Sequence, residues 1–174
     1  MARKFHWQRL LLEKKHNNLK ERWWVLKNIL VFLSVLGLDL GTKKWADAML
    51  PLGKRKRIAK NLLYFQHIKN SGMAYHKLEG KKNVILWITG SLTAVYSFFF
   101  LRACCGNEEV KRYGIPLAIT LGGAYGNFLE RWKKGRVTDF IFIDRGKNPP
   151  IFNIADGALL FGACLVGIMS LKDK

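Results

Sequence analysis

Three long runs without a charged residue constrain this chain more than any other feature of its sequence. They cover residues 83–101, 114–129 and 157–171 and contain 19, 16 and 15 residues. A helix needs about 20 mostly apolar residues to cross a bilayer, and a few polar groups near its ends are tolerated. Residues 23–40 form a fourth, weaker candidate with polar residues near both ends. The pattern therefore predicts an all-α membrane protein with four transmembrane helices, at about residues 23–40, 83–101, 114–129 and 155–171.

The charge of the chain indicates contact with a membrane surface. Lys and Arg number 30 against 12 Asp and Glu, which gives a formal net charge of +18. Basic residues gather at the ends of the apolar runs, where lipid headgroups would lie, and no nucleic-acid-binding motif occurs. We therefore expect membrane lipid as a partner and no nucleic acid. A hydrophobic content of 49% excludes a disordered chain, and three cysteines are too few for a disulfide scaffold.

The N-terminal segment is predicted to be a unit of its own. Residues 1–22 are basic and carry bulky apolar side chains, so they form either a cytoplasmic segment lying on the membrane interface or a solvated basic tail. Residues 23–174 then form the membrane domain. A competing interpretation of the first span is a cleaved signal peptide, with an apolar core at residues 29–38 and a cleavage-like site at Ala46-Asp47-Ala48. The long region before that core speaks against it.

Two polar loops are predicted on one face of the membrane. Four spans place both termini on the other face, and the short basic segments beside the helices favour the cytoplasm for the termini. The first loop, residues 41–82, contains a strand-like stretch at residues 61–68, so we expect a small extramembrane β-containing segment there. The other loop, residues 130–154, is predicted as a polar loop.

Small residues four positions apart predict close helix contacts in two of the spans. Gly122 and Gly126 lie in the third span, and Ala163 and Gly167 lie in the fourth. Pairs with this spacing let another helix approach closely.

Four ionisable residues at membrane edges are the first candidates for function, because burying such groups is costly. Asp39 ends the first span, Arg131 follows the third, Asp139 lies in the loop of residues 130–154 and Asp156 opens the fourth span, so all four fall on one face. Each aspartate also has a simpler interpretation: Asp156 as a helix N-cap, Asp139 as a surface charge and Asp39 as a helix-end charge reaching water. Two aspartates held close together would share a proton, and one could activate water while the other protonates a carbonyl.

Asparagine side chains accompany these charges. Asn127 precedes Arg131 by four residues and Asn153 precedes Asp156 by three, so each pair can share a helix face. Asn70 lies in a turn-like stretch. No Ser-His-Asp arrangement, HExxH motif or glycine-rich phosphate loop occurs, so the sequence gives no sign of a metal or a cofactor.

Several motifs resemble the lipoprotein signal peptidase (signal peptidase II) family, and they occur in that family's order. The matching stretches are Asp39-Leu40-Gly41-Thr42-Lys43, Asn70-Ser71-Gly72-Met73-Ala74-Tyr75, Gly122 to Arg131, Gly135 to Phe140 and Phe152 to Asp156. They run from residue 39 to residue 156 and coincide with the four predicted spans. The order of several motifs makes the resemblance specific, where one motif alone would be weak.

The resemblance implies a polytopic aspartic endopeptidase of the bacterial cytoplasmic membrane, without a metal or cofactor. Such enzymes cut the signal peptide from prolipoproteins whose cysteine carries a diacylglyceryl group, and their active site lies toward the outer face. The catalytic residues fall on Asp139 and Asp156. The supporting or substrate-binding residues fall on Asp39, Lys43, Asn70, Gly72, Asn127, Arg131 and Asn153.

Three departures from the family's pattern stand out. Glu130 replaces the usual Asp, Met73 and Tyr75 replace the usual Ala and Phe, and the basic N-terminal extension is not part of the pattern. None of them falls on the expected catalytic pair. Two other functions stay open: a catalytically silent relative that binds lipoproteins or lipid, and a small four-span transporter subunit, which would place charges in mid-membrane.

Overall fold

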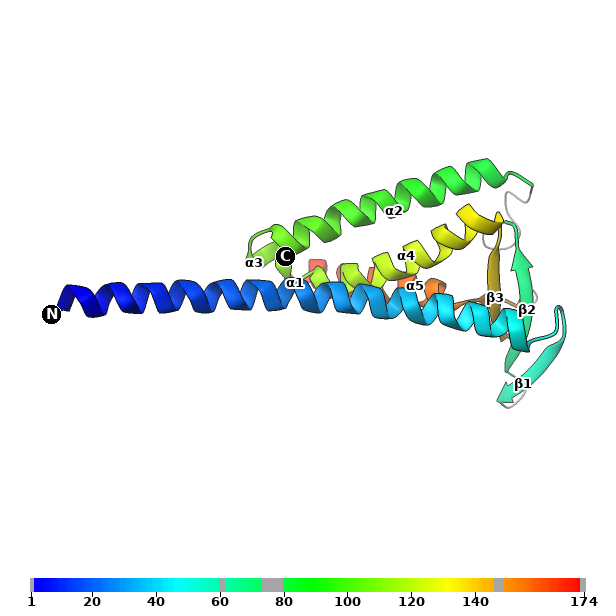
Figure 1. Cartoon of the computed structure of the whole chain (residues 1–174). Helices are drawn as coiled ribbons and strands as arrows, with labels where there is room; N and C mark the ends of the chain where they lie inside the picture. The colour runs from blue at the N-terminus through cyan, green and yellow to red at the C-terminus, as the bar shows by residue number, and fades with distance from the viewer. Residues whose placement is uncertain (1, 60–61, 73–79, 146–148, 173–174) are drawn as a thin grey trace.

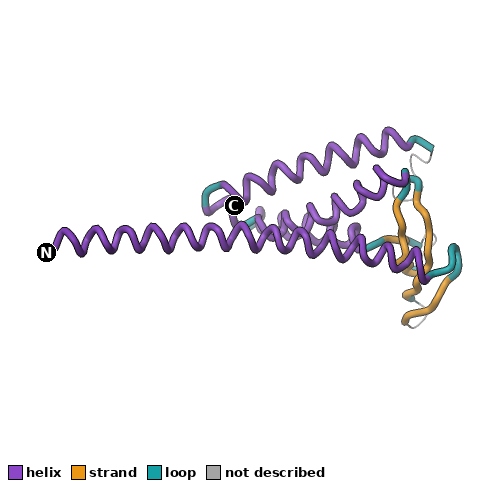
Figure 2. Tube along the Cα trace, viewed as in Figure 1, coloured by secondary structure: helices purple, strands orange, loops and turns teal. Residues whose placement is uncertain are grey.

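The described residues form a bundle of four long helices, with a small sheet across one end (Figures 1 and 2). The computed structural model describes residues 2–59, 62–72, 80–145 and 149–172, with side chains from residue 13 onward. The elements in chain order are α1 (Ala2–Met49), β1 (Arg55–Ala59), β2 (Leu63–Asn70), α2 (Lys82–Cys105), α3 (Glu108–Lys111), α4 (Gly114–Lys134), β3 (Val137–Ile143), β4 (Ile151–Phe152) and α5 (Ile154–Leu171).

Helix α1 is far longer than the predicted first span. It contains 48 residues, which corresponds to about 72 Å at the usual rise of an α-helix. Its N-terminal half projects beyond the other helices, and its C-terminal end reaches the sheet (Figure 1). The helix passes through residue 22 without a break, so residues 2–22 are helical and continuous with the first span. The division of the chain at residue 22 stays a prediction.

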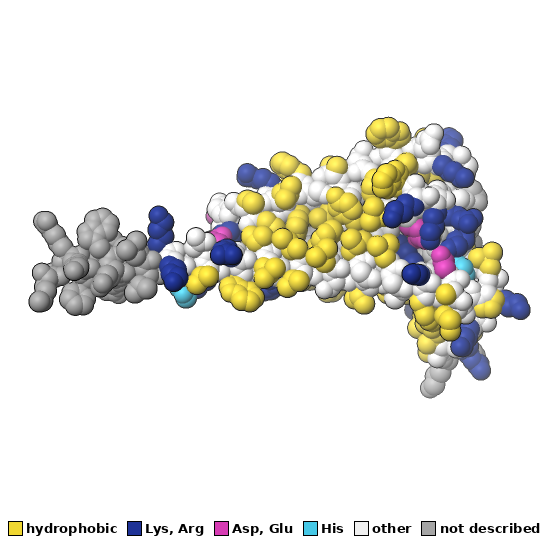
Figure 3. Space-filling view, viewed as in Figure 1, with side chains coloured by type: hydrophobic (Ala, Val, Ile, Leu, Met, Phe, Trp, Pro, Cys, Tyr) yellow, Lys and Arg dark blue, Asp and Glu magenta, His cyan; other side chains and the backbone are white. Residues whose placement is uncertain are grey.

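Among the described residues, three helices are long and apolar enough to cross a membrane: α1 over Glu13–Met49, α2 over Lys82–Cys105 and α5 over Ile154–Leu171. Helix α4, at the third predicted span, is not among these three, so this criterion does not establish four spans. The reason that α4 does not meet this criterion is its position in the bundle. Helix α4 packs against α1, α2 and α5 and buries small residues there, so it needs fewer lipid-facing apolar side chains. On the face seen in Figure 3, Lys and Arg side chains gather at both ends of a broad hydrophobic band.

Glycines let α4 approach its neighbours closely. A Cβ atom at Gly122 would lie 2.7 Å from Cβ of Val35, and one at Gly126 would clash with the Asp39 carboxylate. Both partners belong to α1, so the predicted contact face of Gly122 and Gly126 is confirmed. The pair Ala163 and Gly167 makes no such contact within the described ranges of the chain, because a Cβ at Gly167 would meet nothing within 4 Å.

Helix α5 contacts α4 closely at Gly162, and not at Ala163 and Gly167. A Cβ atom there would lie 2.8 Å from the Pro116 carbonyl oxygen and closer still to Oγ1 of Thr120. Thr120 is itself fully buried, and its hydroxyl donates to the Pro116 carbonyl at 2.9 Å. The contact between the two helices therefore needs a residue without a side chain at this position.

The sheet is antiparallel with the strand order β1-β2-β3-β4. Strand β2 confirms the strand expected in the first loop. Strands β3 and β4 correct the prediction of a plain loop over residues 130–154. The β3 sequence Val-Thr-Asp-Phe-Ile-Phe-Ile is rich in β-branched and aromatic residues and largely buried, and Phe140 packs with Ala46 and Leu50 at the end of α1.

The chain turns from α4 into β3 at Gly135. This residue caps the helix with φ of 66°, in the left-handed region that glycine adopts at little cost. Its N–H donates to the Arg131 carbonyl at 2.7 Å. The turn sends β3 back across the end of the bundle, which brings Asp139 to the start of α5.

We predict that Gly162→Ala lowers the stability of the bundle. The added methyl group would push α5 away from Pro116 and Thr120, at a cost of about 1–3 kcal/mol in the free energy of unfolding. Thermal unfolding in detergent measures the change. Gly167→Ala is the matched control on the same helix, where the methyl group has room and alanine favours the helix. Equal unfolding midpoints for the two variants would contradict the prediction.

Candidate active site

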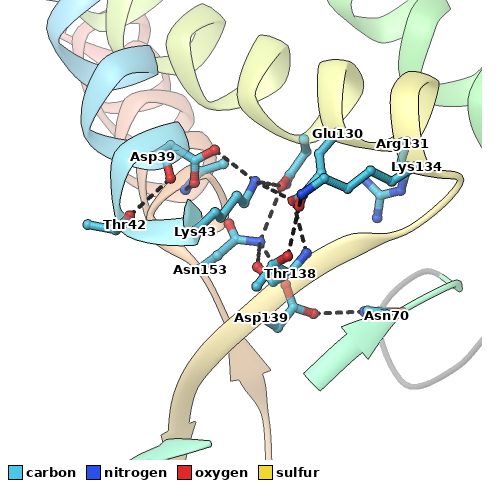
Figure 4. Close-up of polar contacts among 12 residues, drawn as sticks. Asp39, Thr42, Lys43, Asn70, Glu130, Arg131, Lys134, Thr138, Asp139 and Asn153 are labelled. Carbon is cyan, nitrogen blue, oxygen red and sulfur yellow. Dashed lines mark hydrogen bonds and ion pairs between the residues drawn. The ribbon is translucent and has the colours of Figure 1, made fainter. Parts of the chain in front are cut away.

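A buried lysine lies at the centre of the site. Lys43 and Asp39 are one turn apart on α1, and their side chains are 2% and 0% exposed. Nζ of Lys43 lies 2.7 Å from Oδ2 of Asp39, donates to Oδ1 of Asn127 at 2.8 Å and lies 3.7 Å from Oε2 of Glu130. The charge of the lysine is therefore surrounded by acceptors from α1 and α4 (Figure 4).

Two asparagine side chains connect the lysine to the two candidate catalytic carboxylates. Asn127 donates through Nδ2 to Oδ1 of Asp156 at 2.7 Å. Asn153 donates through Nδ2 to Oδ1 of Asp139 at 2.7 Å and to Oδ1 of Asn127 at 3.2 Å. Each aspartate thus accepts from one member of this amide pair, and the two amides are bonded to each other.

The N-terminus of α5 fixes the position of Asp156. Asn153 is the N-cap of this helix, and it forms a capping box with Asp156, the third helical residue. The Asn153 N–H donates to Oδ2 of Asp156 at 3.2 Å, and the Asp156 N–H donates to Oδ1 of Asn153 at 3.0 Å. The Ala155 N–H donates to Oδ1 of Asp39 at 2.8 Å, which joins this turn to α1. Asp156 therefore takes part in capping α5, as its simpler interpretation expected, although Asn153 is the N-cap itself. The interpretation of Asp39 as a charge reaching water is wrong, because its side chain is buried.

Asp139 lies in β3 rather than in a loop, and it is 4% exposed. Its Oδ2 accepts a bond from Nδ2 of Asn70 at 2.9 Å, and Oδ1 of Asn70 accepts from the Gly72 N–H at 2.9 Å. The Arg131 guanidinium donates to the Gly72 carbonyl at 3.4 Å. The interpretation of Asp139 as a surface charge is therefore wrong, and Asn70 holds it against the segment that follows β2.

Burial and a neighbouring charge change the acidity of Asp139. Removal from water raises the pKa of its carboxyl group, and the negative charge of Asp156 raises it further, to about 6. Bonds from Asn70 and Asn153 act in the opposite direction. The two aspartates therefore interact electrostatically.

All nine residues singled out in the sequence meet at this end of the bundle, although their roles stay predictions. They come from α1, β2 and the segment after it, α4, β3 and the start of α5: Asp39, Lys43, Asn70, Gly72, Asn127, Arg131, Asp139, Asn153 and Asp156. Met73 and Tyr75 lie outside the described residues. Within the described part of the chain, no group of His, Cys, Asp and Glu side chains could hold a metal ion.

Thr138 and Glu130 form a support for Asp139 that the sequence did not indicate. Glu130 accepts from the Thr138 N–H at 2.9 Å and from its hydroxyl at 2.7 Å, and it also accepts from Lys134 at 2.9 Å. Asn153 donates to the Thr138 carbonyl at 3.4 Å. Because Thr138 directly precedes Asp139 in β3, these bonds fix the backbone that carries the carboxylate.

Asp47 extends this support toward the sheet. It is bonded to Lys69, lies 3.1 Å from Nε2 of His67 and accepts from Thr138 at 3.2 Å. A signal for it was present, since Asp39, Lys43 and Asp47 recur every four residues and share one helix face.

The fold is shared with solved membrane enzymes. One chain, described as a bacterial membrane enzyme determined by the in meso method at 2.3 Å resolution, has a TM-score of 0.74 and 30% identity, with 84% of this chain and 88% of that chain covered. A second such enzyme, at 1.9 Å resolution, has a TM-score of 0.72 and 29% identity over 85% of this chain and 94% of that chain. The fold is therefore that of a membrane enzyme.

A sequence model described as Signal peptidase (SPase) II matches residues 31–172. The lipoprotein signal peptidase of Shouchella clausii (strain KSM-K16) is 35% identical over 136 residues, which are 78% of this chain and 87% of the relative. That of Staphylococcus haemolyticus (strain JCSC1435) is 28% identical over 156 residues, which are 89% of this chain and 97% of the relative. The chain belongs to the signal peptidase II family, a family of membrane proteases.

We predict that Asp139 makes the stability of the protein depend on pH. Because its pKa is raised from 3.8 to about 6, the folded state binds this proton more tightly than the unfolded chain does. This proton then contributes up to about 3 kcal/mol to the free energy of unfolding. The contribution is complete below about pH 4 and is lost as the pH rises through 6. The unfolding midpoint of the wild type, measured relative to Asp139→Asn, should therefore fall between pH 4 and pH 7. A constant difference over that range would contradict the prediction.

Proposed function

We propose that this protein is an aspartic endopeptidase that removes signal peptides from diacylglyceryl-modified prolipoproteins, cutting before the lipidated cysteine. The observation that carries the proposal is the pair Asp139 and Asp156, each held by one member of a bonded asparagine pair, Asn153 and Asn127. The relatives are lipoprotein signal peptidases, which supplies the substrate class.

The two aspartates divide the proton transfers between them. Burial and the negative charge of Asp156 raise the pKa of Asp139, so we assign the acid to Asp139 and the base to Asp156. A water loses a proton to Asp156, its oxygen bonds to the scissile carbonyl carbon, and Asp139 protonates the carbonyl oxygen.

The second half of the reaction restores both carboxyl groups. Asp156 gives its proton to the nitrogen of the lipidated cysteine, Asp139 takes a proton from one hydroxyl of the tetrahedral intermediate, and the carbon–nitrogen bond breaks. The products are a signal peptide with a new carboxyl end and a lipoprotein with a free amino group. Each aspartate returns to its starting protonation state, so the pair is ready for the next substrate.

The neighbouring polar groups position the pair and the substrate. Arg131 interacts electrostatically with both aspartates and bonds to Gly72, so its charge can stabilise the developing oxyanion. Asn70 bonds both to Asp139 and to the Gly72 N–H, so it joins the residues after β2 to the catalytic pair. Lys43 acts through Asn127 and positions Asp156 without touching it.

We further propose that all four long helices cross the bacterial cytoplasmic membrane, with both termini in the cytoplasm and the site toward the outer face. Helix α4 packs against three candidate membrane helices, so it shares their environment. Trp23, Trp24 and the basic residues near them lie at the end of the bundle opposite the aspartates, where headgroups are expected. Residues 1–22 are then a basic cytoplasmic extension of the membrane domain of residues 23–174.

The geometry around Glu130 supports an active enzyme rather than a silent relative. The additional methylene, compared with the aspartate usual in the family, is accommodated because the Glu130 carboxylate reaches both donors of Thr138. A transporter subunit is not supported, since the buried bonded charges of Asp39, Lys43 and Glu130 lie beside the two aspartates rather than in mid-membrane.

We predict that Asp139→Asn and Asp156→Asn each abolish cleavage of a diacylglyceryl-modified prolipoprotein. Each change removes one carboxyl group from the proton transfers and should lower the rate by about 10²- to 10⁴-fold or more. Detergent-purified protein is incubated with the substrate, and the loss of the signal peptide is followed by the size shift on a gel.

Asp144→Asn is the matched control, because this carboxylate follows β3 directly and is 43% exposed. It should cleave at the wild-type rate. The same prolipoprotein without the lipid should not be cut by any variant. Normal cleavage by Asp139→Asn or Asp156→Asn would contradict the proposed catalytic role of this pair. A wild-type protein that is folded but inactive would favour the alternative of a catalytically silent relative.

A further inference from the structure

A groove on the outside of the bundle lies far from the aspartates. It has a volume of about 820 Å³ and runs along α1 from Lys20 to Val35, with Ile119 of α4 as its other wall. Its length along α1 is about 22 Å at the usual helical rise. Ligand sites commonly have volumes in this range, and no step of the proposed reaction uses this one.

The groove is basic and aromatic at one end and apolar at the other. Lys20, Trp23, Trp24 and Lys27 line the end nearer the N-terminus. Nζ of Lys27 lies 5.2 Å from the ring centroid of Trp24, so the ammonium group stands over the indole. Tryptophan and lysine side chains favour the level of lipid headgroups.

The apolar end continues toward the middle of the bundle. Leu30, Val31 and Val35 of α1 face Ile119 of α4 across it. Leu30 is 53% exposed, so its side chain is available to a hydrocarbon chain. Headgroup-level residues are thus followed, one turn deeper, by residues suited to acyl chains.

The charges of the groove are uncompensated. No acidic residue lines it, and neither Lys20 nor Lys27 has an ion-pair partner among the residues that the structure describes. Glu21, on the same stretch of α1, is bonded to Lys111 instead. Two ammonium groups without an ion-paired carboxylate favour an anionic headgroup over a zwitterionic one, whose own cation would meet no acidic residue in the lining.

We propose that this groove binds one anionic phospholipid, with its phosphate between Lys20 and Lys27 and an acyl chain along Leu30, Val31 and Ile119. Trp23 lies 16 residues before Asp39, about 24 Å along α1, so the headgroup belongs to the leaflet opposite the active site. The assignment of that leaflet rests on the proposed topology, whereas binding itself does not depend on the proposed activity.

Native mass spectrometry of the full-length protein tests the site. The detergent-purified protein is mixed with phosphatidylglycerol or with phosphatidylcholine of identical acyl chains, and the bound fraction of each lipid is measured. The wild type should retain one phosphatidylglycerol in preference to phosphatidylcholine. The Lys20→Gln/Lys27→Gln double variant should lose about five- to thirtyfold in phosphatidylglycerol retention and keep its weak binding of phosphatidylcholine.

Lys14→Gln/Lys15→Gln is the matched control, because it removes the same charge from the same helix outside the groove. It should retain the lipid as the wild type does. Asp139→Asn should also retain it, which separates this test from that of the protease. Equal retention of both lipids by the wild type, equal losses in the two lysine pairs, or a second copy of the chain in place of the lipid would each overturn the proposal.

Discussion

A lysine without access to water must be surrounded by acceptors, and the arrangement of the whole site follows from this constraint. Lys43 has only donors, so the Asn127 side chain has to present its oxygen to it. The nitrogen of that amide is thereby directed at Asp156. The same Asn127 oxygen accepts from Asn153, whose nitrogen also reaches Asp139. One buried charge thus determines the orientation of both amides and of both aspartates.

Close helix packing brings the acceptors within reach of the buried Lys43 charge. The carboxylate of Asp39 lies where the side chain of any residue other than glycine at position 126 would be. With glycine there, α1 and α4 come near enough for Asp39 to accept from the Ala155 N–H of α5 as well as from Lys43. Removing one partner of such a group would leave a buried charge unpaired, which is far more costly than the loss of a surface ion pair. The polar site and the glycine-rich contact therefore depend on each other.

The sequence predicted the residues of the site better than the elements that carry them. The four predicted spans fall on α1, α2, α4 and α5, of which α1, α2 and α5 are long and apolar enough to cross a membrane, and the ordered motifs brought Asp39, Asp139 and Asp156 to one end. The strand β3 that carries Asp139 was missed, because its seven residues lie between charged residues and prolines and the whole stretch was predicted to be a polar loop. Thr138 was missed as well, because its role depends on a contact with Glu130 that sequence spacing does not reveal. Long-range polar contacts of this kind exist only once the fold has formed.

The distribution of the site over the chain has a consequence for biosynthesis. Asp39 and Lys43 are made early, Asn127 and Asp139 follow after two further segments, and Asp156 comes at the start of the last helix. A chain still on the ribosome therefore carries Asp139 without its partner aspartate and without the Asn153 amide that orients it. Under the proposed mechanism, hydrolysis begins only when α5 has entered the membrane beside α4, so the emerging enzyme is inert toward neighbouring precursors until its own insertion is finished.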